Sequence, residues 1–290
     1  MSKTIRFRGH TICHLHLAEI WKYVCIIPLL IFTSLPLVYV ICTAFKPLEE
    51  IMRFPPQFFV RNPTLNNFED LLVSLSGSSV PFLRYLFNSL IISLGAVIGT
   101  IIISSMGAYA LAKHKVLFGN TIFLIIISSL MFSSYVTQIP TYLVVKELGI
   151  LDTYWALIIP KLAVAYNLFL MKQFCEQIPN TLLEAARMEG AGEWKIFLRI
   201  VMPLLRPAWA TLAVFSFASS WNDYFGPLVY ITQQQLKTLP LALQSISESG
   251  NLTRAGATAA STFILIIPTV LVYSLMQKRL MSTMVHSGIK

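Results

Sequence analysis

Six long apolar blocks constrain this chain more than any other feature. They cover residues 23–44, 86–112, 121–144, 154–174, 208–231 and 257–276. Each is close to the ~20 residues that a helix needs to cross ~30 Å of hydrocarbon. Backbone polar groups at that depth must pair within their own segment, so blocks of this length are expected to be helices. The sequence therefore predicts an all-α integral membrane protein with six transmembrane helices.

The composition excludes an ordinary soluble domain. Of the 290 residues, 56% are hydrophobic and only 12% are charged, whereas soluble domains have about 25% charged residues. The apolar blocks favour a single transmembrane domain over residues 23–280, between tails at residues 1–22 and 281–290. Pro28 and Pro36 in the first block, and Pro268 in the last, predict kinks.

The lysines and arginines predict the orientation of the chain. Both termini are expected in the cytoplasm, because the segments that are then inside hold fourteen of these residues and those outside hold seven. The net charge of +9 indicates attraction to anionic headgroups of the membrane lipid. It does not indicate nucleic acid, because no soluble segment interleaves basic and aromatic residues.

Residues 179–207 form a long polar segment between the fourth and fifth blocks. Thr181 and Glu184 match a capping box that begins a short helix. Gly190, Ala191 and Gly192 then predict a tight turn. A second short helix is expected to follow, in which Trp194, Phe197, Leu198 and Val201 recur at helical spacing, and Pro207 suits the first turn of the next helix. The segment is either a plain surface loop or a helical hairpin that docks onto a partner.

Two charged residues, Lys161 and Asp223, fall inside the predicted fourth and fifth spans. Charge at that depth costs about 2.5–3.5 kcal/mol on insertion scales. They either line a polar solute cavity or form an internal ion pair or subunit contact. Other polar or amphipathic residues join them as candidates for a pathway or a subunit interface: Asn88, Tyr166, Asn167, Trp221 and Asn222.

The sequence gives little support for catalysis or metal binding. It contains no phosphate-binding loop of the GxxxxGK[ST] type, no HExxH, no CxxC pair and no GxSxG. His10, Cys13, His14 and His16 match no common zinc spacing, so a solvated tail is favoured over a metal site. We therefore expect no catalytic residues, no metal and no cofactor.

The segment 179–207 resembles the EAA loop of ATP-binding-cassette (ABC) importer permeases. The resemblance depends on Glu184-Ala185-Ala186, Gly190 at the sixth position after the glutamate, and Ile200 followed by Pro203. It implies a cytoplasmic coupling-helix loop between helices 4 and 5 that sits in a groove of an ATPase subunit. The residues expected to couple to the ATPase are Glu184, Ala185, Ala186, Arg187, Glu189, Gly190, Ala191, Gly192, Phe197, Ile200 and Pro203.

The resemblance extends over residues 23–290, to the carbohydrate (MalG-type) permeases. It includes Asn88-Ser89, Ile139-Pro140, Trp221-Asn222-Asp223 and Thr238-Leu239-Pro240 in the family's order. It implies a multi-pass protein of the bacterial plasma (inner) membrane, paired with a second permease subunit, two cytoplasmic ATPases that bind ATP and magnesium, and an extracytoplasmic solute-binding protein. The solute would be a sugar, oligosaccharide, polyol or glycerol phosphate. The alternative is an ion-gradient-driven secondary transporter or channel that uses Lys161 and Asp223.

Overall fold

The computed structural model describes residues 17–76, 80–247 and 255–287, and these residues form helices joined by loops. Three helices are continuous and long enough to cross a membrane: α1 (Leu17–Ala44), α4 (Phe82–Lys113) and α15 (Ala255–Ser287). They match the first, second and sixth apolar blocks. α1 begins within the segment predicted as the N-terminal tail, and α15 continues into the predicted C-terminal tail.

The other three blocks are not single straight helices, which corrects the prediction. α5 (Gly119–Ser129) and α6 (Ser134–Glu147) meet at 111°, and α7 (Tyr154–Leu162) and α8 (Ala165–Glu176) at 47°. The fifth block divides into α12 (Arg206–Trp221) and α13 (Phe225–Tyr230). α12 also meets the helical segment before it, Glu193–Leu204, at 75°. The described helices therefore give three candidate spans, or up to six if α5–α6, α7–α8 and Glu193–Leu204 with α12 each count as one.

Local chemistry explains where the third and fourth blocks break. Ser133 occupies the N-cap of α6, where its hydroxyl accepts from the Tyr135 amide at 3.4 Å, so a new helix begins there. In the fourth block, Pro160 lacks an amide proton, and α7 ends two residues later. The Thr100 hydroxyl donates to the Lys161 carbonyl oxygen at 3.3 Å, which satisfies one group that the break leaves free.

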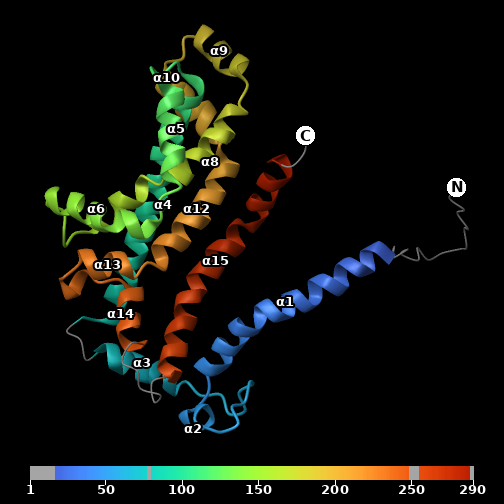
Figure 1. Cartoon of the computed structure of the whole chain (residues 1–290), viewed down its shortest axis with the longest axis vertical. Helices are drawn as coiled ribbons and strands as arrows, with labels where there is room; N and C mark the ends of the chain where they lie inside the picture. Colours follow the sequence, from blue (N-terminus) through green and yellow to red (C-terminus); the bar gives the residue numbers. More distant parts are fainter. Residues whose placement is uncertain (1–16, 77–79, 248–254, 288–290) are drawn as a thin grey trace, which may run out of the picture.

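The short elements gather at two opposite ends of the bundle (Figure 1). One end holds α2 (Leu48–Ile51), α3 (Asn66–Ser76) and the start of α15; η2 (Gln234–Leu236) and α14 (Leu239–Ser247) follow α13 in the chain. The other end holds α9 (Asn180–Met188) and α10 (Glu193–Ile196). The η1 (Phe197–Val201) and α11 (Met202–Leu204) turns connect α10 to α12.

α4 packs closely against the broken fourth block. A Cβ atom on Gly99 would lie 2.6 Å from a methyl carbon of Leu162, and one on Gly95 would lie 2.9 Å from Ile158. Small residues four positions apart let membrane helices approach in this way. α4 thus runs beside α7 and α8 from one end of the bundle to the other.

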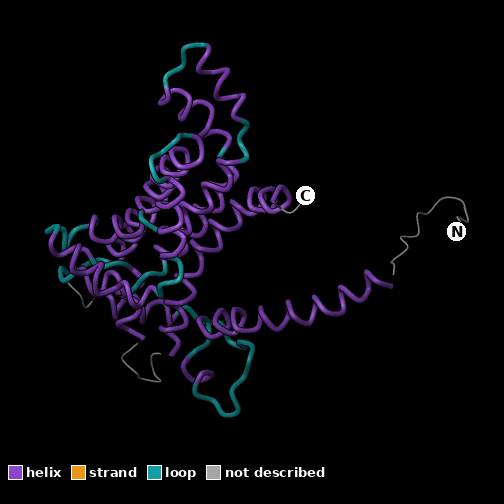
Figure 2. Tube along the Cα trace, turned by 45° about the horizontal axis from the view of Figure 1, so that its top comes forward, coloured by secondary structure: helices purple, strands orange, loops and turns teal. Residues whose placement is uncertain are grey.

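α1 leaves the bundle along most of its length, as Figures 1 and 2 both show. Its last turn is buried, with Thr43 and Ala44 packed at the α3 end. There the Asn67 amide donates to the carbonyl oxygens of Ala44 and Lys46 at 2.9 and 2.7 Å. By contrast, the large apolar side chains between Tyr23 and Phe32 are each at least 52% exposed.

Candidate functional site

The predicted docking segment is a helix–turn–helix at one end of the bundle, but its first helix is not capped as expected. Pro179, in extended geometry, occupies the N-cap of α9, and no side chain caps the helix. Thr181 and Glu184 lie inside α9 and are exposed. The capping-box prediction is therefore wrong, because the extended proline starts the helix before Thr181.

The predicted turn at Gly190 is confirmed. Gly190 has φ +77°, in the left-handed region that only glycine adopts readily. The Ala191 amide donates to the Ala186 carbonyl oxygen at 3.0 Å, and the Gly190 amide donates to that of Arg187 at 2.9 Å. This pair of bonds is a Schellman motif with Gly190 at its left-handed position.

The second part of the loop buries two of the four apolar residues that recur at helical spacing and exposes the other two. Ile196, Phe197 and Val201 are buried, whereas Trp194 and Leu198 point outward. The reason is that η1 is a π-helix, whose i→i+5 hydrogen bonds place residues five apart on one face. The buried face contributes to one core cluster that also contains Ala108 and Tyr109 of α4, Met171 and Cys175 of α8, and Leu183 and Ala186 of α9.

Glu193, which is not among the residues predicted from the sequence, joins three elements at this end of the bundle. Its carboxylate accepts from the Tyr109 hydroxyl of α4 at 2.7 Å and from Nε of Arg187 in α9 at 2.8 Å. Nε2 of His114 lies 3.4 Å away. The bonds from Arg187 and then Tyr109 lower the pKa of Glu193, so this residue is a carboxylate at neutral pH.

The end of α4 also holds the entrance to the loop. The Lys113 ammonium donates to the carbonyl oxygens of Glu176 and Ile178 at 3.2 and 2.6 Å, and to the Asn180 side-chain oxygen at 3.0 Å. Tyr109, Lys113 and His114 therefore contact both arms of the loop. No residue type or spacing within the loop predicts these contacts, because the partners lie more than 60 residues away.

The outer surface of the loop combines exposed apolar and acidic side chains. Met188 is 89% exposed and Trp194 is 66% exposed, and Leu182 and Leu198 are also exposed. Exposed residues predicted to couple to the ATPase lie beside them, namely Glu184, Ala185, Arg187, Glu189, Gly190 and Gly192; Ala191, Ile200 and Pro203 are partly buried, and Ala186 and Phe197 are buried. Buried contacts thus support a loop whose exposed face is free to bind a partner.

The two charged residues of the predicted spans pair with each other. Nζ of Lys161 lies 2.8 Å from Oδ2 of Asp223, and both side chains are about one-fifth exposed. Nζ of Lys161 also donates to the Ser220 hydroxyl at 3.4 Å. Oδ1 of Asp223 accepts from the Gly226 amide at 2.9 Å, at the start of α13. The pair thus links the α7–α8 break to the α12–α13 break.

The other predicted pathway residues divide into two groups. Asn88, Asn167 and Trp221 are buried. The Asn88 amide donates to the carbonyl oxygens of Gln235 and Lys237 and accepts from the Tyr154 hydroxyl, and the Trp221 indole donates to the Leu265 carbonyl oxygen. Tyr166 and Asn222 are exposed. Their roles in a pathway stay predictions.

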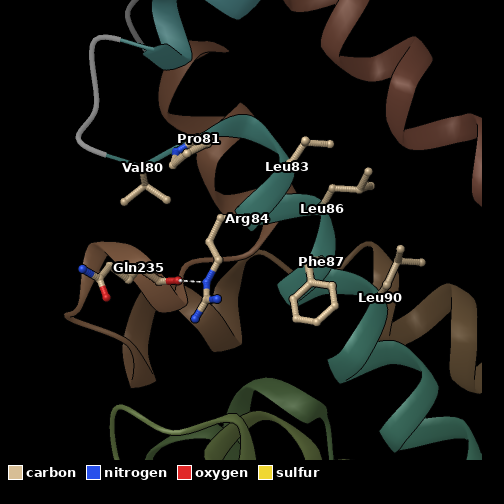
Figure 3. A pocket seen from close by; sticks show the side chains of 8 residues that line it. All are labelled: Val80, Pro81, Leu83, Arg84, Leu86, Phe87, Leu90 and Gln235. Atoms are coloured by element: carbon tan, nitrogen blue, oxygen red, sulfur yellow. Dashed lines mark hydrogen bonds between the residues drawn. The ribbon is translucent and has the colours of Figure 1, made fainter.

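An open pocket of about 780 Å³ lies at the start of α4, away from both regions (Figure 3). Its wall is apolar, with Leu83, Leu86, Phe87 and Leu90 following one another along α4. Arg84 lies at its edge, where Nε donates to the Gln235 carbonyl oxygen at 3.4 Å. No candidate site residue lines this pocket.

In the described part of the chain, no three His, Cys, Asp or Glu side chains gather in a metal-binding group. The histidines and cysteine of the N-terminal segment, His10 to His16, lie outside the described residues. Cys175 is buried beside Lys113 and Glu176 in the loop-end core.

A family of known proteins matches nearly the whole chain. The model described as "Binding-protein-dependent transport system inner membrane component" matches residues 26–284. Protein LplC of Bacillus subtilis is 32% identical over 271 residues, which cover 89% of this chain and 90% of LplC. The sn-glycerol-3-phosphate transport system permease protein UgpE of Yersinia enterocolitica is 35% identical over 214 residues, 73% of this chain and 76% of UgpE. The arabinooligosaccharides transport system permease protein AraQ of B. subtilis is 28% identical over 256 residues, 88% of this chain and 90% of AraQ.

Solved structures agree in fold. A chain from the crystal structure of a bacterial ABC transporter involved in the import of the acidic polysaccharide alginate superimposes with a TM-score of 0.78 at 25% identity, covering 92% of this chain and 99% of that one. A chain from the alginate transporter in complex with its alginate pentasaccharide-bound periplasmic protein gives a TM-score of 0.58 at 14% identity, and shows the fold alone.

Proposed function

The chain belongs to the family of binding-protein-dependent transport system inner membrane components, and we propose that it forms one half of the translocation pathway of an ATP-driven importer. The relatives with named functions are transport permeases and not enzymes, and those named here handle sugar-type solutes. In this proposal the chain has no catalytic residues of its own. Separate ATPase subunits bind ATP and magnesium and hydrolyse the nucleotide.

The exposed face of the loop 179–207 carries the proposal. Met188 and Trp194 are large apolar side chains left in solvent, and apolar surface of this kind marks an interaction site when polar residues surround it. The buried face, by contrast, packs into a core with α4 and α8. We infer that the exposed face docks onto the ATPase, and that the buried face transmits the movement of the ATPase to the bundle.

The basic residues at the loop end of the bundle support a cytoplasmic location for the loop. Arg187 lies in α9, Lys113 bonds to Asn180 at its start, and Lys172 and Arg206 lie in α8 and α12, which precede and follow the loop. The positive-inside rule then favours the cytoplasm for this end. We propose six spans in a bacterial plasma membrane with both termini inside. Each bent pair then counts as one span or as part of one.

α1 is the proposed contact with a second permease subunit. A helix that is apolar all round is buried in a protein or surrounded by lipid, and the side chains between Tyr23 and Phe32 are exposed on all sides of α1. Because α1 also diverges from the bundle (Figure 2), the rest of this chain leaves most of the surface of α1 uncovered. The opposite end, with α2 and α3, is available to an external solute-binding protein.

The proposed cargo is a carbohydrate-type solute, on the basis of the relatives alone. Their names include arabinooligosaccharides and sn-glycerol-3-phosphate, which are polyhydroxylated and differ in charge. The ion-gradient-driven alternative would need charged groups that are free to take up an ion. Lys161 and Asp223 instead bind each other, which favours the importer.

Co-purification tests the proposal directly. The tagged protein, extracted in mild detergent, is expected to bring down an ATPase and a second permease, and the complex is expected to hydrolyse ATP. Gly190→Val should leave the protein in the membrane and abolish most ATPase recovery, because a β-branched residue cannot adopt φ +77° without strain. Glu184→Lys, which reverses one exposed charge on the docking face, should reduce recovery severalfold.

The matched control is Gly149→Val, which places the same substitution at a left-handed glycine outside the loop. Gly149, between α6 and α7, has φ +67°, and an added Cβ atom there meets no atom within 4 Å, so the valine causes similar backbone strain away from the docking face. This variant should retain the ATPase at close to the wild-type level. Full ATPase recovery and full solute uptake in both Gly190→Val and Glu184→Lys would refute the assignment of the docking face.

A further inference from the structure

The Lys161–Asp223 pair lies where two apolar segments break. Lys161 is the second-last residue of α7, and Asp223 lies between α12 and α13. Irregular backbone at membrane depth is tolerated only where protein buries it or where it lines a water-filled cavity. Secondary transporters place their solute sites at discontinuous helices of this kind. The placement therefore favours a solute site over a contact with lipid.

Both partners of the pair have hydrogen-bonding capacity left. The Lys161 ammonium has three donors, and it contacts Asp223 at 2.8 Å and Ser220 at 3.4 Å. Each Asp223 oxygen accepts one bond, from Lys161 or from Gly226, and each has a second lone pair. A solute hydroxyl can therefore accept from the ammonium and donate to the carboxylate at the same place.

Exposed aromatic and amide side chains lie near the pair along the chain, on α8 and at the end of α12. The Tyr166 and Phe215 rings pack edge to face with centroids 6.2 Å apart. Phe215 and Asn222 are seven residues apart on and just after α12, so they share one face of this helix. Tyr224 follows Asp223 directly, and all four side chains are exposed. Flat aromatic rings suit the C–H faces of sugars, and the amide both donates and accepts.

We propose that Lys161, Asp223, Tyr166, Asn222 and Tyr224 form this chain's part of the solute site, and that the site prefers uncharged polyhydroxylated solutes to anionic ones. The pair has no net charge. An anion close enough to bind Lys161 also lies within a few ångströms of the Asp223 carboxylate, which repels it. A neutral sugar meets no such repulsion. This inference rests on the proposed function and specifies the class of solute.

Saturation-transfer difference NMR on the purified complex in nanodiscs tests the preference. The probes are arabinotriose, which is neutral, and trigalacturonate, which carries three carboxylates. Wild-type complex should transfer saturation severalfold more strongly to arabinotriose. Asp223→Asn leaves the Lys161 charge uncompensated, so the preference should shift toward trigalacturonate. Tyr224→Ala, which keeps the ion pair, should weaken the arabinotriose signal severalfold.

Tyr273→Ala is the matched control, because Tyr273 is a similarly exposed tyrosine on α15 (53% against 43% for Tyr224). It should leave both signals unchanged. The inference is overturned if the wild type prefers trigalacturonate or binds neither probe. It is also overturned if Tyr224→Ala behaves like Tyr273→Ala, a comparison that stands even if Asp223→Asn does not fold. The NMR measurements use preparations that contain the ATPase. If no ATPase co-purifies with the chain, that result contradicts the proposed function and not this inference.

Discussion

The two charged regions of this molecule, the Glu193 cluster at the loop end and the Lys161–Asp223 pair between the helices, are built differently. Glu193 is 47% exposed and accepts from residues of two other helices. Asp223 is 22% exposed and has one charged partner. The Glu193 carboxylate thus has several partners and is accessible to water. The Asp223 carboxylate has a single charged partner and lies between apolar segments.

This difference predicts how each region responds to the loss of a partner. Exposed ion pairs contribute at most about 1 kcal/mol, because water solvates whatever is left unpaired. A single charge left behind in an apolar region costs about 3–5 kcal/mol when it is fully buried. Substitutions in the span should therefore act on folding, whereas those in the loop should act on coupling to the ATPase.

The largest effect is expected for Lys161→Met. This substitution leaves Asp223 unpaired between apolar helices, and we expect it to lower the free energy of unfolding by about 3 kcal/mol. Thermal unfolding of the purified complex in detergent measures the loss. If Lys161→Met unfolded at the wild-type temperature, the claim that an unpaired charge costs more in the span than in the loop would be refuted.

The double variant Lys161→Met/Asp223→Leu is the control for this effect. It removes both charges and fills the space with apolar side chains, so most of the lost stability should return. If the double variant were as unstable as Lys161→Met, the cost would come from lost packing and not from the unpaired carboxylate.

The two regions also differ in how far the sequence predicts them. Lys161 and Asp223 are conspicuous because charge is rare in apolar blocks, so both were selected. Their contact was not predictable, because they are 62 residues apart and meet only where two helices break. The break in the third block has no proline or glycine, because the four residues between α5 and α6 are Leu130, Met131, Phe132 and the N-capping Ser133.

The importance of Glu193, by contrast, could not be predicted from the sequence. A glutamate in a polar loop has nothing unusual about it, so neither its residue type nor its spacing distinguishes it from Glu189. Its role depends on Tyr109 and Arg187, which the fold brings within 3 Å of its carboxylate. By contrast, Gly190 could be predicted, because the turn it makes depends on local backbone geometry alone.

A smaller effect, confined to coupling, is expected for Glu193→Ala. The change leaves Arg187, Tyr109 and His114 without their shared acceptor, so α9 loses the link to α4 that runs through Arg187. We expect ATPase recovery to fall severalfold while the unfolding temperature changes little, since water solvates the freed groups. Lys195→Ala, at an exposed neighbouring position, is the control and should retain the ATPase. An equal loss of ATPase recovery in both variants would show that coupling does not depend on the contacts of Glu193.

The smallest effect is expected for Tyr109→Phe, which separates the hydrogen bond from the packing. The phenylalanine ring keeps its contacts with Phe197 and His114, whose rings lie 5.7 and 4.8 Å from that of Tyr109. Only the bond to Glu193 is lost, at a cost of about 0.5–1.5 kcal/mol. If α4 receives the movement of the loop through this bond, solute uptake per ATP hydrolysed should fall in Tyr109→Phe although the ATPase still binds. In the Glu193→Gln background, where the acceptor is already weakened, the same substitution should change uptake less, whereas additive losses would mean that the two residues act independently.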